Sequence, residues 1–435
     1  MPLYLVPAHP YALPYTTISP QNTMNTTDSA LEAQLTWQVG DFATLLTIKE
    51  HGITPLPLFS PLVKDFFSAW SELLSTCQPA LPDLRALGFF LRRRALEHMQ
   101  QDYEDLAQRS LGVGVVFHSS PSNVPTNFAY SFVMGLLAGN CNLVRLPKKP
   151  FPQVDMICAQ LNELLSREEF AALQPYCLFF SCASTPEALG PLSAMSKARV
   201  IFGGDDNIRK LHSYPLPPAG RDLAFADRYS LAVLNAATYN AAAESDQVRL
   251  AQSFFQDTYL NDQNACSSPA AVVWVGTKEG CTQAATVFWQ KLHEHLHTQP
   301  YALQARPSLS KLEQVMVAAA ENEVGTLEVA AGSDEVVTRV QLHTAKFSLQ
   351  RYKGNSGLFY ELAVKSLEEI TPLISADCQS LLYYGFSGDE LRDMVVSKRL
   401  VGIDRIVPIG QALRFTPVWD GVDMIAALSR QVSVL

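Results

Sequence analysis

The chain has 435 residues, of which 48% are hydrophobic and 17% are charged, and its formal net charge is -9 at pH 7. This length exceeds what one ordinary hydrophobic core contains, so two domains or one elaborate domain are expected. The acidic balance argues against a nucleic-acid-binding protein, which would need clustered basic residues.

The composition also bears on compartment and metal content. The first twenty residues contain prolines but no lysine or arginine, and they lack the continuous apolar centre of a secretory signal. No run of about 18 apolar residues is present to span a bilayer. The 8 cysteines have no CxxC spacing, which suits a reducing cytoplasm, and neither they nor the 9 histidines are spaced like zinc ligands. We therefore expect a cytoplasmic protein with neither a membrane span nor a structural metal.

The first quarter of the chain combines an extended arm with helices. Residues 1 to about 30 are rich in proline, threonine and asparagine, which predicts a strand or an extended arm. Phe59 to Gln101 has apolar residues at helical spacing, and Pro82 lies near a helix start. The basic cluster Arg92 to Arg94 is usually a solvated face, although it could also meet an acidic carrier protein or the phosphates of coenzyme A. We assign residues 1–108 to this N-terminal arm and helical extension.

Strands, loops and helices alternate from Gly112 onward, as in an open α/β sheet. Short apolar strands are expected at 111–117, 142–146, 177–182 and 198–202, with helices at 127–138 and 155–166. The last strand leads into Gly203, Gly204 and Asp205, where backbone can approach a phosphate or a nicotinamide ring. The usual GxGxxG fingerprint is missing. We assign residues 109–236 to a dinucleotide-binding domain.

Two further segments suggest the chemistry. Cys266 lies among amides and hydroxyls in Asn261-Asp-Gln-Asn-Ala-Cys-Ser-Ser-Pro269, which favours a presented thiol, although free cysteines are often buried and structural. Asn123 lies between two prolines in Pro121-Ser-Asn-Val-Pro125, as expected of a fixed hydrogen-bond donor. A thiolate and an amide that holds an oxyanion are the minimum apparatus for acyl transfer through a thioester. We assign 237–400 to a catalytic domain bearing Cys266, and 401–435 to a segment that packs back on the core or on a neighbouring subunit.

The same motifs carry a family resemblance. The run from Val115 to Pro150 is similar to the aldehyde dehydrogenase segment in which Pro-x-Asn-x-Pro supplies the oxyanion asparagine. More closely, several motifs resemble the LuxC family of acyl-CoA reductases and occur in that family's order. They are Phe117 to Pro125, Phe202-Gly-Gly-Asp205, Asn264 to Pro269, Gly402 to Gly410 and Trp419-Asp-Gly421.

The resemblance implies an α/β, aldehyde dehydrogenase-like fold, with a Rossmann-like cofactor domain, an α/β catalytic domain and a helical N-terminal extension. It also implies NADPH-dependent reduction of a fatty acyl-CoA or acyl-protein thioester to the fatty aldehyde. Such enzymes often work beside an acyl-protein synthetase partner, in luminescence or other lipid metabolism, and usually form homo-oligomers.

The resemblance further assigns roles to single residues. Cys266 is the expected nucleophile and Asn123 holds the oxyanion. Hydrolytic aldehyde dehydrogenases place a glutamate before the cysteine to activate water, and Phe225 falls at that position here, with Asp227 as a remote stand-in. Without a base for water, an acyl-enzyme is discharged by hydride or by a thiol. His118 is a candidate proton source, although a loop histidine is more often a structural hydrogen-bonding residue.

The strand after the asparagine loop bears on the cofactor. NAD-preferring aldehyde dehydrogenases carry Lys-Pro-Ser-Glu there, whereas this chain has Arg145-Leu-Pro-Lys-Lys149. Arg145 and Lys148 would favour a 2′-phosphate on the adenosine ribose, which predicts NADPH; a solvent-facing basic loop is the alternative. Gly203, Gly204 and Asp205 are expected near the nicotinamide.

The sequence is also compatible with two other functions. A coenzyme A-acylating aldehyde dehydrogenase would use the same residues oxidatively on a shorter aldehyde. A non-catalytic acyl-carrying subunit would use Cys266 only to hold an acyl group passed to it by a partner.

Overall fold

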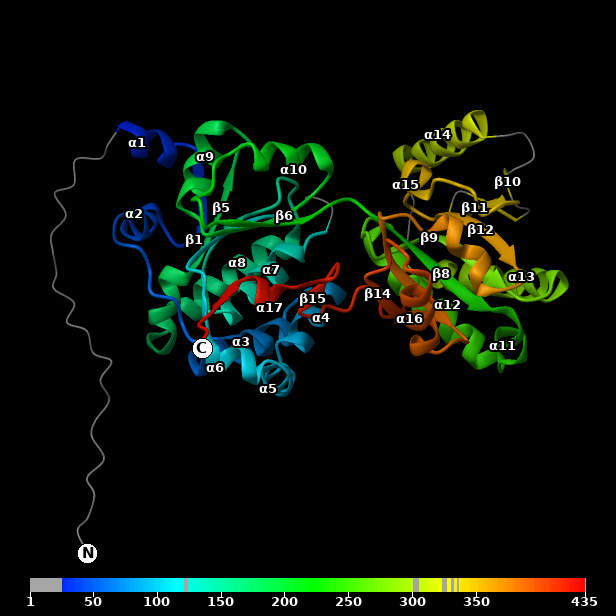
Figure 1. Ribbon diagram of the computed structural model, residues 1–435, viewed down its shortest axis with the longest axis horizontal. Coiled ribbons are helices and arrows are strands. Elements are labelled where there is room, and N and C mark those ends of the chain that lie inside the picture. The colour runs from blue at the N-terminus through cyan, green and yellow to red at the C-terminus, as the bar shows by residue number, and fades with distance from the viewer. Residues whose placement is uncertain are drawn as a thin grey trace, which may run out of the picture.

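Two mainly parallel sheets form the frame of the computed structural model, one in each of two lobes that lie side by side (Figure 1). The structure describes residues 26–120, 124–299, 305–322, 327–329, 332–334 and 336–434. The first lobe contains residues 26–225 and the C-terminal segment from Phe415, and the second lobe contains residues 229–408. No helix among the described residues combines the length and the apolar content needed to cross a membrane.

The sheet of the first lobe has six strands in the order β1-β5-β4-β3-β6-β7. These are β1 (Leu35–Val39), β3 (Val115–Ser119), β4 (Cys141–Arg145), β5 (Cys177–Cys182), β6 (Ala198–Phe202) and β7 (Arg221–Phe225). Only β1, at the edge, is antiparallel to its neighbour. The strands β3, β4 and β6 are buried along their whole length, as expected of a parallel sheet with both faces covered by helices.

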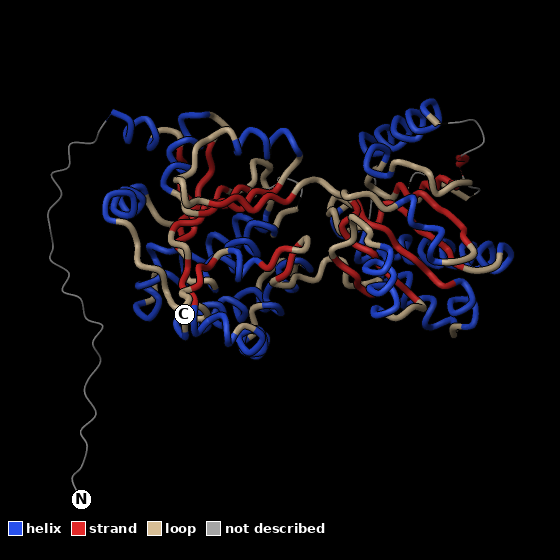
Figure 2. Tube along the Cα trace, in the orientation of Figure 1, coloured by secondary structure: helices blue, strands red, loops and turns tan. Residues whose placement is uncertain are grey.

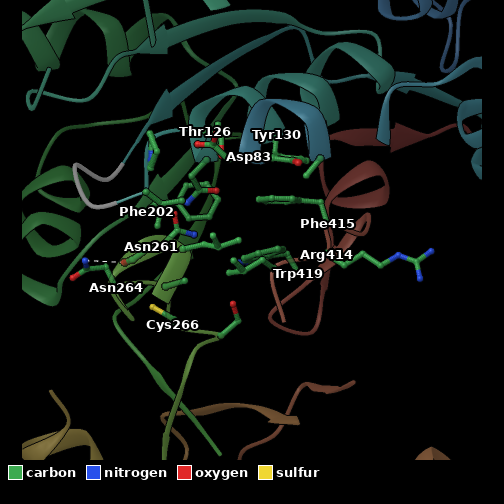
Figure 3. Close-up of a pocket in the computed structure, with 18 of the residues that line it drawn as sticks. Asp83, Thr126, Tyr130, Phe202, Asn261, Asn264, Cys266, Arg414, Phe415 and Trp419 are labelled. Atoms are coloured by element: carbon green, nitrogen blue, oxygen red, sulfur yellow. Dashed lines mark hydrogen bonds between the residues drawn. The ribbon is translucent and has the colours of Figure 1, made fainter. Parts of the chain in front are cut away.

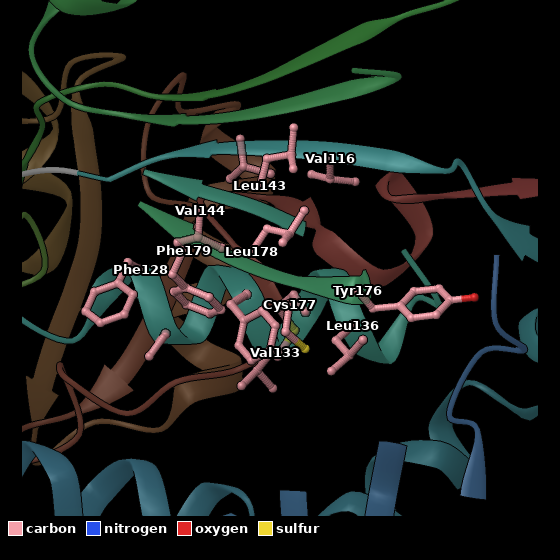
Figure 4. Close-up of a cluster of buried hydrophobic side chains, with 14 of the residues drawn as sticks. Val116, Phe128, Val133, Leu136, Leu143, Val144, Tyr176, Cys177, Leu178 and Phe179 are labelled. Atoms are coloured by element: carbon pink, nitrogen blue, oxygen red, sulfur yellow. The ribbon is translucent and has the colours of Figure 1, made fainter. Parts of the chain in front are cut away.

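Helices from the N-terminal extension share the core of this lobe. The extension contributes α1 (Thr26–Glu32), α2 (Phe42–His51), α3 (Pro61–Thr76), α4 (Pro82–Phe90), α5 (Arg93–Asp102) and most of α6 (Glu104–Arg109). The other helices of this lobe are α7 (Asn127–Leu137), α8 (Pro152–Leu165), α9 (Pro186–Met195) and α10 (Asp205–His212), with the 3-10 helix η1 (Glu168–Tyr176). Phe67 and Trp70 of α3 pack edge to face on Phe132 of α7. Because α7 is covered by the sheet on one side and by α3 and α17 on the other, it is apolar on nearly all faces. Figure 4 shows this layer, with Phe128 and Val133 of α7 beneath the sheet.

The strand order of the first sheet reverses between β3 and β6. From β3 the chain runs outward through β4 and β5, then returns to the other side of β3 to form β6 and β7. At this reversal, the carboxyl end of β3 leads into residues 120–126 and that of β6 leads into Gly203 and Gly204. Open α/β sheets bind ligands in the crevice at such a reversal.

The second lobe is built on a seven-stranded sheet in the order β10-β11-β12-β9-β8-β13-β14. Its strands are β8 (Tyr229–Asn235), β9 (Pro269–Val275), β10 (Leu327–Val329), β11 (Thr338–Leu342), β12 (Leu358–Val364), β13 (Cys378–Tyr384) and β14 (Arg405–Pro408), all parallel except β10. The surrounding helices are α11 (Ala236–Ala241), α12 (Glu244–Thr258), α13 (Lys278–Thr298), α14 (Ala305–Glu321), α15 (Leu349–Tyr352) and α16 (Gly388–Lys398), with the 3-10 helices η2 (Tyr259–Asn261) and η3 (Leu367–Leu373). Separate apolar clusters fill the two faces of this sheet.

The chain crosses between the lobes twice (Figure 2). Residues 226–228 form the first crossing, between β7 and β8, and residues 409–414 form the second, after β14. The C-terminal segment then forms β15 (Val418–Trp419), β16 (Val422–Asp423), α17 (Met424–Ala427) and β17 (Ser429–Gln431). Strand β17 pairs with β2 (Ser110–Gly112), and Ile425 and Leu428 are buried in the first lobe. Residues 418–431 therefore complete the first lobe.

Three of the predicted strands and one predicted helix agree closely with the structure. The strands expected at 142–146, 177–182 and 198–202 and the helix expected at 127–138 are present to within a residue. The single strand expected at 111–117 is wrong: it is split into β2 and β3 at Gly114, whose φ of 119° turns the chain. Residues 26–32 form a helix where an extended arm was expected, and residues 1–25 lie outside the described residues.

The lobes also divide the chain differently from the expected boundaries. Strand β8 belongs to the second sheet although it precedes the boundary expected at residue 236, and β1 joins the first sheet although it lies within the expected extension 1–108.

The contacts of Arg199, in β6, predict that this side chain stabilises the first lobe. Its buried guanidinium forms a two-pronged ion pair with Asp222 and donates to the carbonyl oxygens of Leu211 and Tyr214. Arg199→Met removes the guanidinium partner of Asp222 and leaves only the half-exposed His212 beside it, so we expect a loss of about 3–5 kcal/mol in the free energy of unfolding, measured with urea. Arg209→Met, which removes an exposed ion pair with Asp206, should change it by less than about 1 kcal/mol. Equal effects of the two changes would contradict this account.

Candidate active site

A cavity of 2010 Å³ lies where the two lobes meet and is lined by both chain crossings. The first lobe contributes residues at the carboxyl ends of β3, β4 and β6, together with α4, α5 and the start of α7. The second lobe contributes α12 and the loop that carries Cys266. All eight cysteines lie within the described residues, and Cys266 alone lines this cavity, as expected for a presented thiol.

The loop that carries Cys266, residues 262–268 between η2 and β9, is fixed by its neighbours. Gln263, which has a φ of 59°, donates to the carbonyl oxygens of Pro269 and Leu358 and accepts from the Gly357 N–H. The Ser230 hydroxyl donates to the carbonyl oxygen of Cys266 at 2.7 Å. A side chain tied to two strands holds this loop in one conformation, so the position of the thiol is set before any substrate binds.

The surroundings of the thiol contain charges of both signs. Sγ of Cys266 lies 3.8 Å from Oδ1 of Asp227, and the same oxygen accepts from Nζ of Lys353 at 2.8 Å. Burial raises the pKa of the Cys266 thiol, and the charges of Asp227 and Asp420 add to this shift. A hydrogen bond from the backbone of Arg228 and the positive charge of Lys353 act in the opposite direction. The thiol therefore needs a proton acceptor to become a thiolate near neutral pH.

Asn123, the expected oxyanion donor, lies outside the described residues. The described residues on either side of it, Ser120 and Val124, both line the cavity. The loop thus begins and ends at the cavity, and the role of Asn123 stays a prediction.

His118 lies away from the cavity. It is fully buried within β3, with Nδ1 2.6 Å from the Ser131 hydroxyl and Nε2 3.0 Å from Oδ1 of Asn142. Burial lowers the pKa of His118 to about 4, despite the hydrogen bond to Asn142, so the ring is neutral at pH 7. Since Oδ1 of Asn142 only accepts, Nε2 donates to it and Nδ1 accepts from Ser131. His118 therefore has a structural role, and we assign it no part in the reaction.

The residues expected at the cofactor gather at the strand-order reversal. Arg145, at the end of β4, donates to the Ser184 hydroxyl at 2.5 Å, and Lys148 lines the cavity beside it. Gly203 has a φ of 150°, and a side chain there would approach Asn207. Gly204 precedes α10 and would meet nothing within 4 Å if it carried a side chain. Asp205 begins α10 and is exposed, and it does not line the cavity.

An aromatic wall, Tyr130, Phe415 and Trp419, extends the cavity away from the thiol. Figure 3 shows the Phe415 ring between those of Tyr130 and Trp419, and the Phe415 and Trp419 rings stack with centroids 5.2 Å apart. Phe415 and Trp419 come from the C-terminal segment, whereas Tyr130 comes from α7. The motif Trp419-Asp-Gly421 was the one signal of this wall in the sequence, and its residue types alone indicate no chemistry.

The buried carboxylate of Asp257 and the half-buried guanidinium of Arg405 hold the second crossing in place. The carboxylate of Asp257 accepts from the backbone N–H groups of Gly410 and Ala412, at 2.5 and 2.9 Å. Arg405 donates to the carbonyl oxygens of Ala412, Gln411 and Arg414. Burial raises the pKa of Asp257 to about 7, against the effect of these bonds. Sequence reasoning missed Asp257, because a single aspartate on an amphipathic helix carries no local signal.

The structural role of His118 predicts a pH effect on stability. Its pKa is lower in the folded state than the usual value near 6.5, so the unfolded chain binds the proton more tightly and stability falls as the pH drops from about 6.5 toward 4. At pH 5 this loss should be about 2 kcal/mol relative to pH 7.5. Urea unfolding of His118→Gln should lack this component, whereas His51→Gln, at an exposed histidine, should keep it. An unchanged pH dependence in His118→Gln would contradict this assignment.

Comparisons with known proteins identify the fold. The chain superimposes on an oxidoreductase from Marinobacter aquaeolei (TM-score 0.57, 10% identity, 93% of this chain and 89% of that chain). It is similar to an NAD-dependent benzaldehyde dehydrogenase from Corynebacterium glutamicum (TM-score 0.59, 13% identity, 93% and 88%). It also matches proline utilization A from Bradyrhizobium japonicum (TM-score 0.62, 14% identity), covering 94% of this chain and 46% of that longer one. At these identities the likeness shows the fold, and the expected aldehyde dehydrogenase-like α/β architecture is confirmed.

Sequence comparison gives the family. A search of curated proteins finds no match. The model of the acyl-CoA reductase (LuxC) family matches residues 89–431, which include the Cys266 loop, both crossings and most of the C-terminal segment. The chain therefore belongs to the acyl-CoA reductase (LuxC) family, a family of oxidoreductases that act on acyl groups.

Proposed function

We propose that this protein reduces a fatty acyl thioester to the aldehyde with NADPH, through an acyl group carried on Cys266. The observation that carries the proposal is the position of one cysteine thiol in a cavity that reaches both the strand-order reversal of the first sheet and an aromatic wall. A cofactor and an acyl chain need separate regions that meet at the nucleophile, and this cavity offers both. The proposal makes the first lobe the cofactor domain and the second lobe the catalytic domain.

The residues at the strand-order reversal fit a nicotinamide dinucleotide. The Ser120 hydroxyl and Nε of Arg145 are buried beside the cavity and have no hydrogen-bond partner among the described residues. Gly203 and Gly204 leave the backbone open at the start of α10, where N–H groups can face a phosphate. NADPH bound there would supply the hydride that converts the acyl group on Cys266 to the aldehyde.

The protein side of the reaction begins at the thiol. Cys266 attacks the thioester carbonyl and the donor thiol leaves, while Asn123 and the backbone N–H of Cys266 would hold the oxyanion. Phe225, at the position where hydrolytic relatives place a glutamate, stacks on Phe202 with centroids 4.7 Å apart and lines the cavity. This aromatic pair puts no carboxylate at that position and presents apolar rings to water on this side of the cavity, which would slow hydrolysis of an acyl-enzyme.

The aromatic wall and nearby apolar side chains favour a long acyl chain. Phe90 of α4, whose ring contacts that of Tyr130, and Met99 of α5 also line the cavity. Each methylene buried against such a surface contributes about 0.8 kcal/mol, so a chain of many carbons gains more than a short one.

The direct test of this proposal is NADPH oxidation, followed by absorbance, with a series of acyl-CoA substrates up to tetradecanoyl-CoA. Wild-type protein should produce aldehyde fastest with long chains, and Cys266→Ala should reduce the rate by at least about 1000-fold, because no other described cysteine lines the cavity. Cys77→Ala, at a half-buried cysteine elsewhere, is the control and should keep its activity. Acyl transfer to Cys266 without NADPH oxidation would instead favour an acyl-carrying subunit. A preference for short aldehydes with coenzyme A would favour the oxidative alternative.

The proposed preference for NADPH over NADH rests on the positive charges of Lys148 and Arg145, which both line the cavity. Lys148→Glu should raise KM for NADPH by about tenfold or more and leave KM for NADH nearly unchanged, since a carboxylate repels the 2′-phosphate. Lys278→Glu makes the same charge change on an exposed turn of α13 and should alter neither constant. Equal effects of Lys148→Glu on both cofactors would overturn the assignment.

A further inference from the structure

We propose that Asp227 is the group that takes the proton from Cys266 and returns it to the departing thiol, and that Lys353 is a positioning residue for its carboxylate. This inference rests on the proposed function, because it concerns the acyl-transfer half of that reaction. It differs from the sequence-based expectation, in which Asp227 was only a remote stand-in for a missing base.

The contact geometry supports the assignment. Oδ1 of Asp227 lies 3.8 Å from Sγ of Cys266, within hydrogen-bond reach of a thiol. Lys353 donates to that same oxygen at 2.8 Å and also to the carbonyl oxygen of Arg228. Gln350 donates to the carbonyl oxygen of Asp227 at 2.8 Å. Both the carboxylate and its backbone are therefore held by the segment that follows β11, and the carboxylate is directed at the thiol.

Asp227 and Cys266 also lie together at the junction of two cavities. Both residues line the large cavity between the lobes and a second, smaller cavity of 270 Å³ on the second lobe. Lys311 and Lys353 line the smaller cavity, along with the amide side chains of Asn264 and Asn355. A thiol that leaves Cys266 through either cavity therefore starts beside the Asp227 carboxylate.

The charges that face the thiol come from every neighbouring element. They are the carboxylates of Asp227 in the first crossing and Asp420 after β15, together with Lys353 after α15 and Lys311 in α14, while Arg228 contributes a backbone hydrogen bond. The guanidinium of Arg228 is paired with Asp404 and Asp420, so it cannot also neutralise Asp227. Of the acidic side chains around the thiol that the structure describes, Asp227 is the one in hydrogen-bond contact with it.

The proton transfers balance without another reactant. As Sγ of Cys266 bonds to the acyl carbon, its proton passes to the Asp227 carboxylate. As the bond between that carbon and the donor sulfur breaks, the proton passes from the Asp227 carboxyl to the departing thiolate. The step changes one thioester for another, with no net proton and no oxidation. General acid-base catalysis of this kind contributes about 10²–10⁴-fold.

Two measurements on the same variants test this inference. The first is the rate of coenzyme A release from tetradecanoyl-CoA without NADPH, by rapid quench between about pH 6.5 and 9.5. The second is the pH dependence of Cys266 alkylation by iodoacetamide, which needs no substrate. In Asp227→Asn we expect release to be at least about 100-fold slower at pH 7 and to recover as the pH rises, since the thiolate then forms without a base.

In Asp227→Asn, alkylation of Cys266 near neutral pH should become faster, whereas coenzyme A release becomes slower. Removal of the Asp227 charge should let the thiol titrate at lower pH, so the variant has more thiolate and still transfers the acyl group more slowly. Asp227→Glu should recover part of the rate. Lys353→Gln should move thiol titration to higher pH and slow release, whereas Lys291→Gln, which breaks an exposed pair with Glu244, should change neither.

The outcomes separate this inference from the proposed function. If the wild type releases coenzyme A and Asp227→Asn does so at the same rate at pH 7, Asp227 transfers no proton and the inference fails while the function stands. If Asp227→Asn is equally slow at every pH, its role is structural and the inference again fails. If the wild type releases none, the proposed function itself is wrong.

Discussion

The arrangement of the whole protein depends on Arg228, the last residue of the first crossing. Its guanidinium pairs with Asp404 and Asp420 and donates to the carbonyl oxygens of Ala376 and Cys378. Asp420 belongs to the returning segment, so one side chain ties the outgoing crossing to the C-terminal part of the chain. Because Arg228 and Asp420 are both largely buried, removing the guanidinium would leave the Asp420 carboxylate without a compensating charge.

This tie explains why the candidate site lies between the lobes. The first crossing brings Asp227 to the thiol of Cys266, and the second brings the aromatic wall, with Asp257 holding its backbone from α12. Burial raises the pKa of Asp420 to about 6, against the effect of Arg228, and its φ of 47° is unusual for a residue other than glycine. Asp420, the residue with this unusual backbone conformation, thus joins Trp419 of the aromatic wall to the ion pair with Arg228. Substrate and cofactor would meet where both crossings are held most firmly.

Much of the fold could be predicted from the sequence because its signals are local. The strands that end at Arg145 and Phe202 are short apolar runs, and the motif around Cys266 identified a thiol that does line a cavity. The misses depend on distant contacts. His118 was a candidate for catalysis because it precedes Asn123 closely, but strand alternation and the approach of Asn142 place its ring in the core. The nearness of Asp227 to the thiol also depends on Lys353, more than a hundred residues away, and no spacing in the sequence reveals it.

The central claim, that Cys266 carries the acyl group in a productive intermediate, is tested most directly by intact mass spectrometry. The protein is mixed with tetradecanoyl-CoA, its mass is measured, NADPH is added, and the mass is measured again alongside the aldehyde formed. We predict one tetradecanoyl group per chain, located on Cys266 by peptide mapping, which disappears with NADPH as an equal amount of aldehyde appears. An acyl group on a different residue, or aldehyde formed while the group on Cys266 persists, would contradict the account.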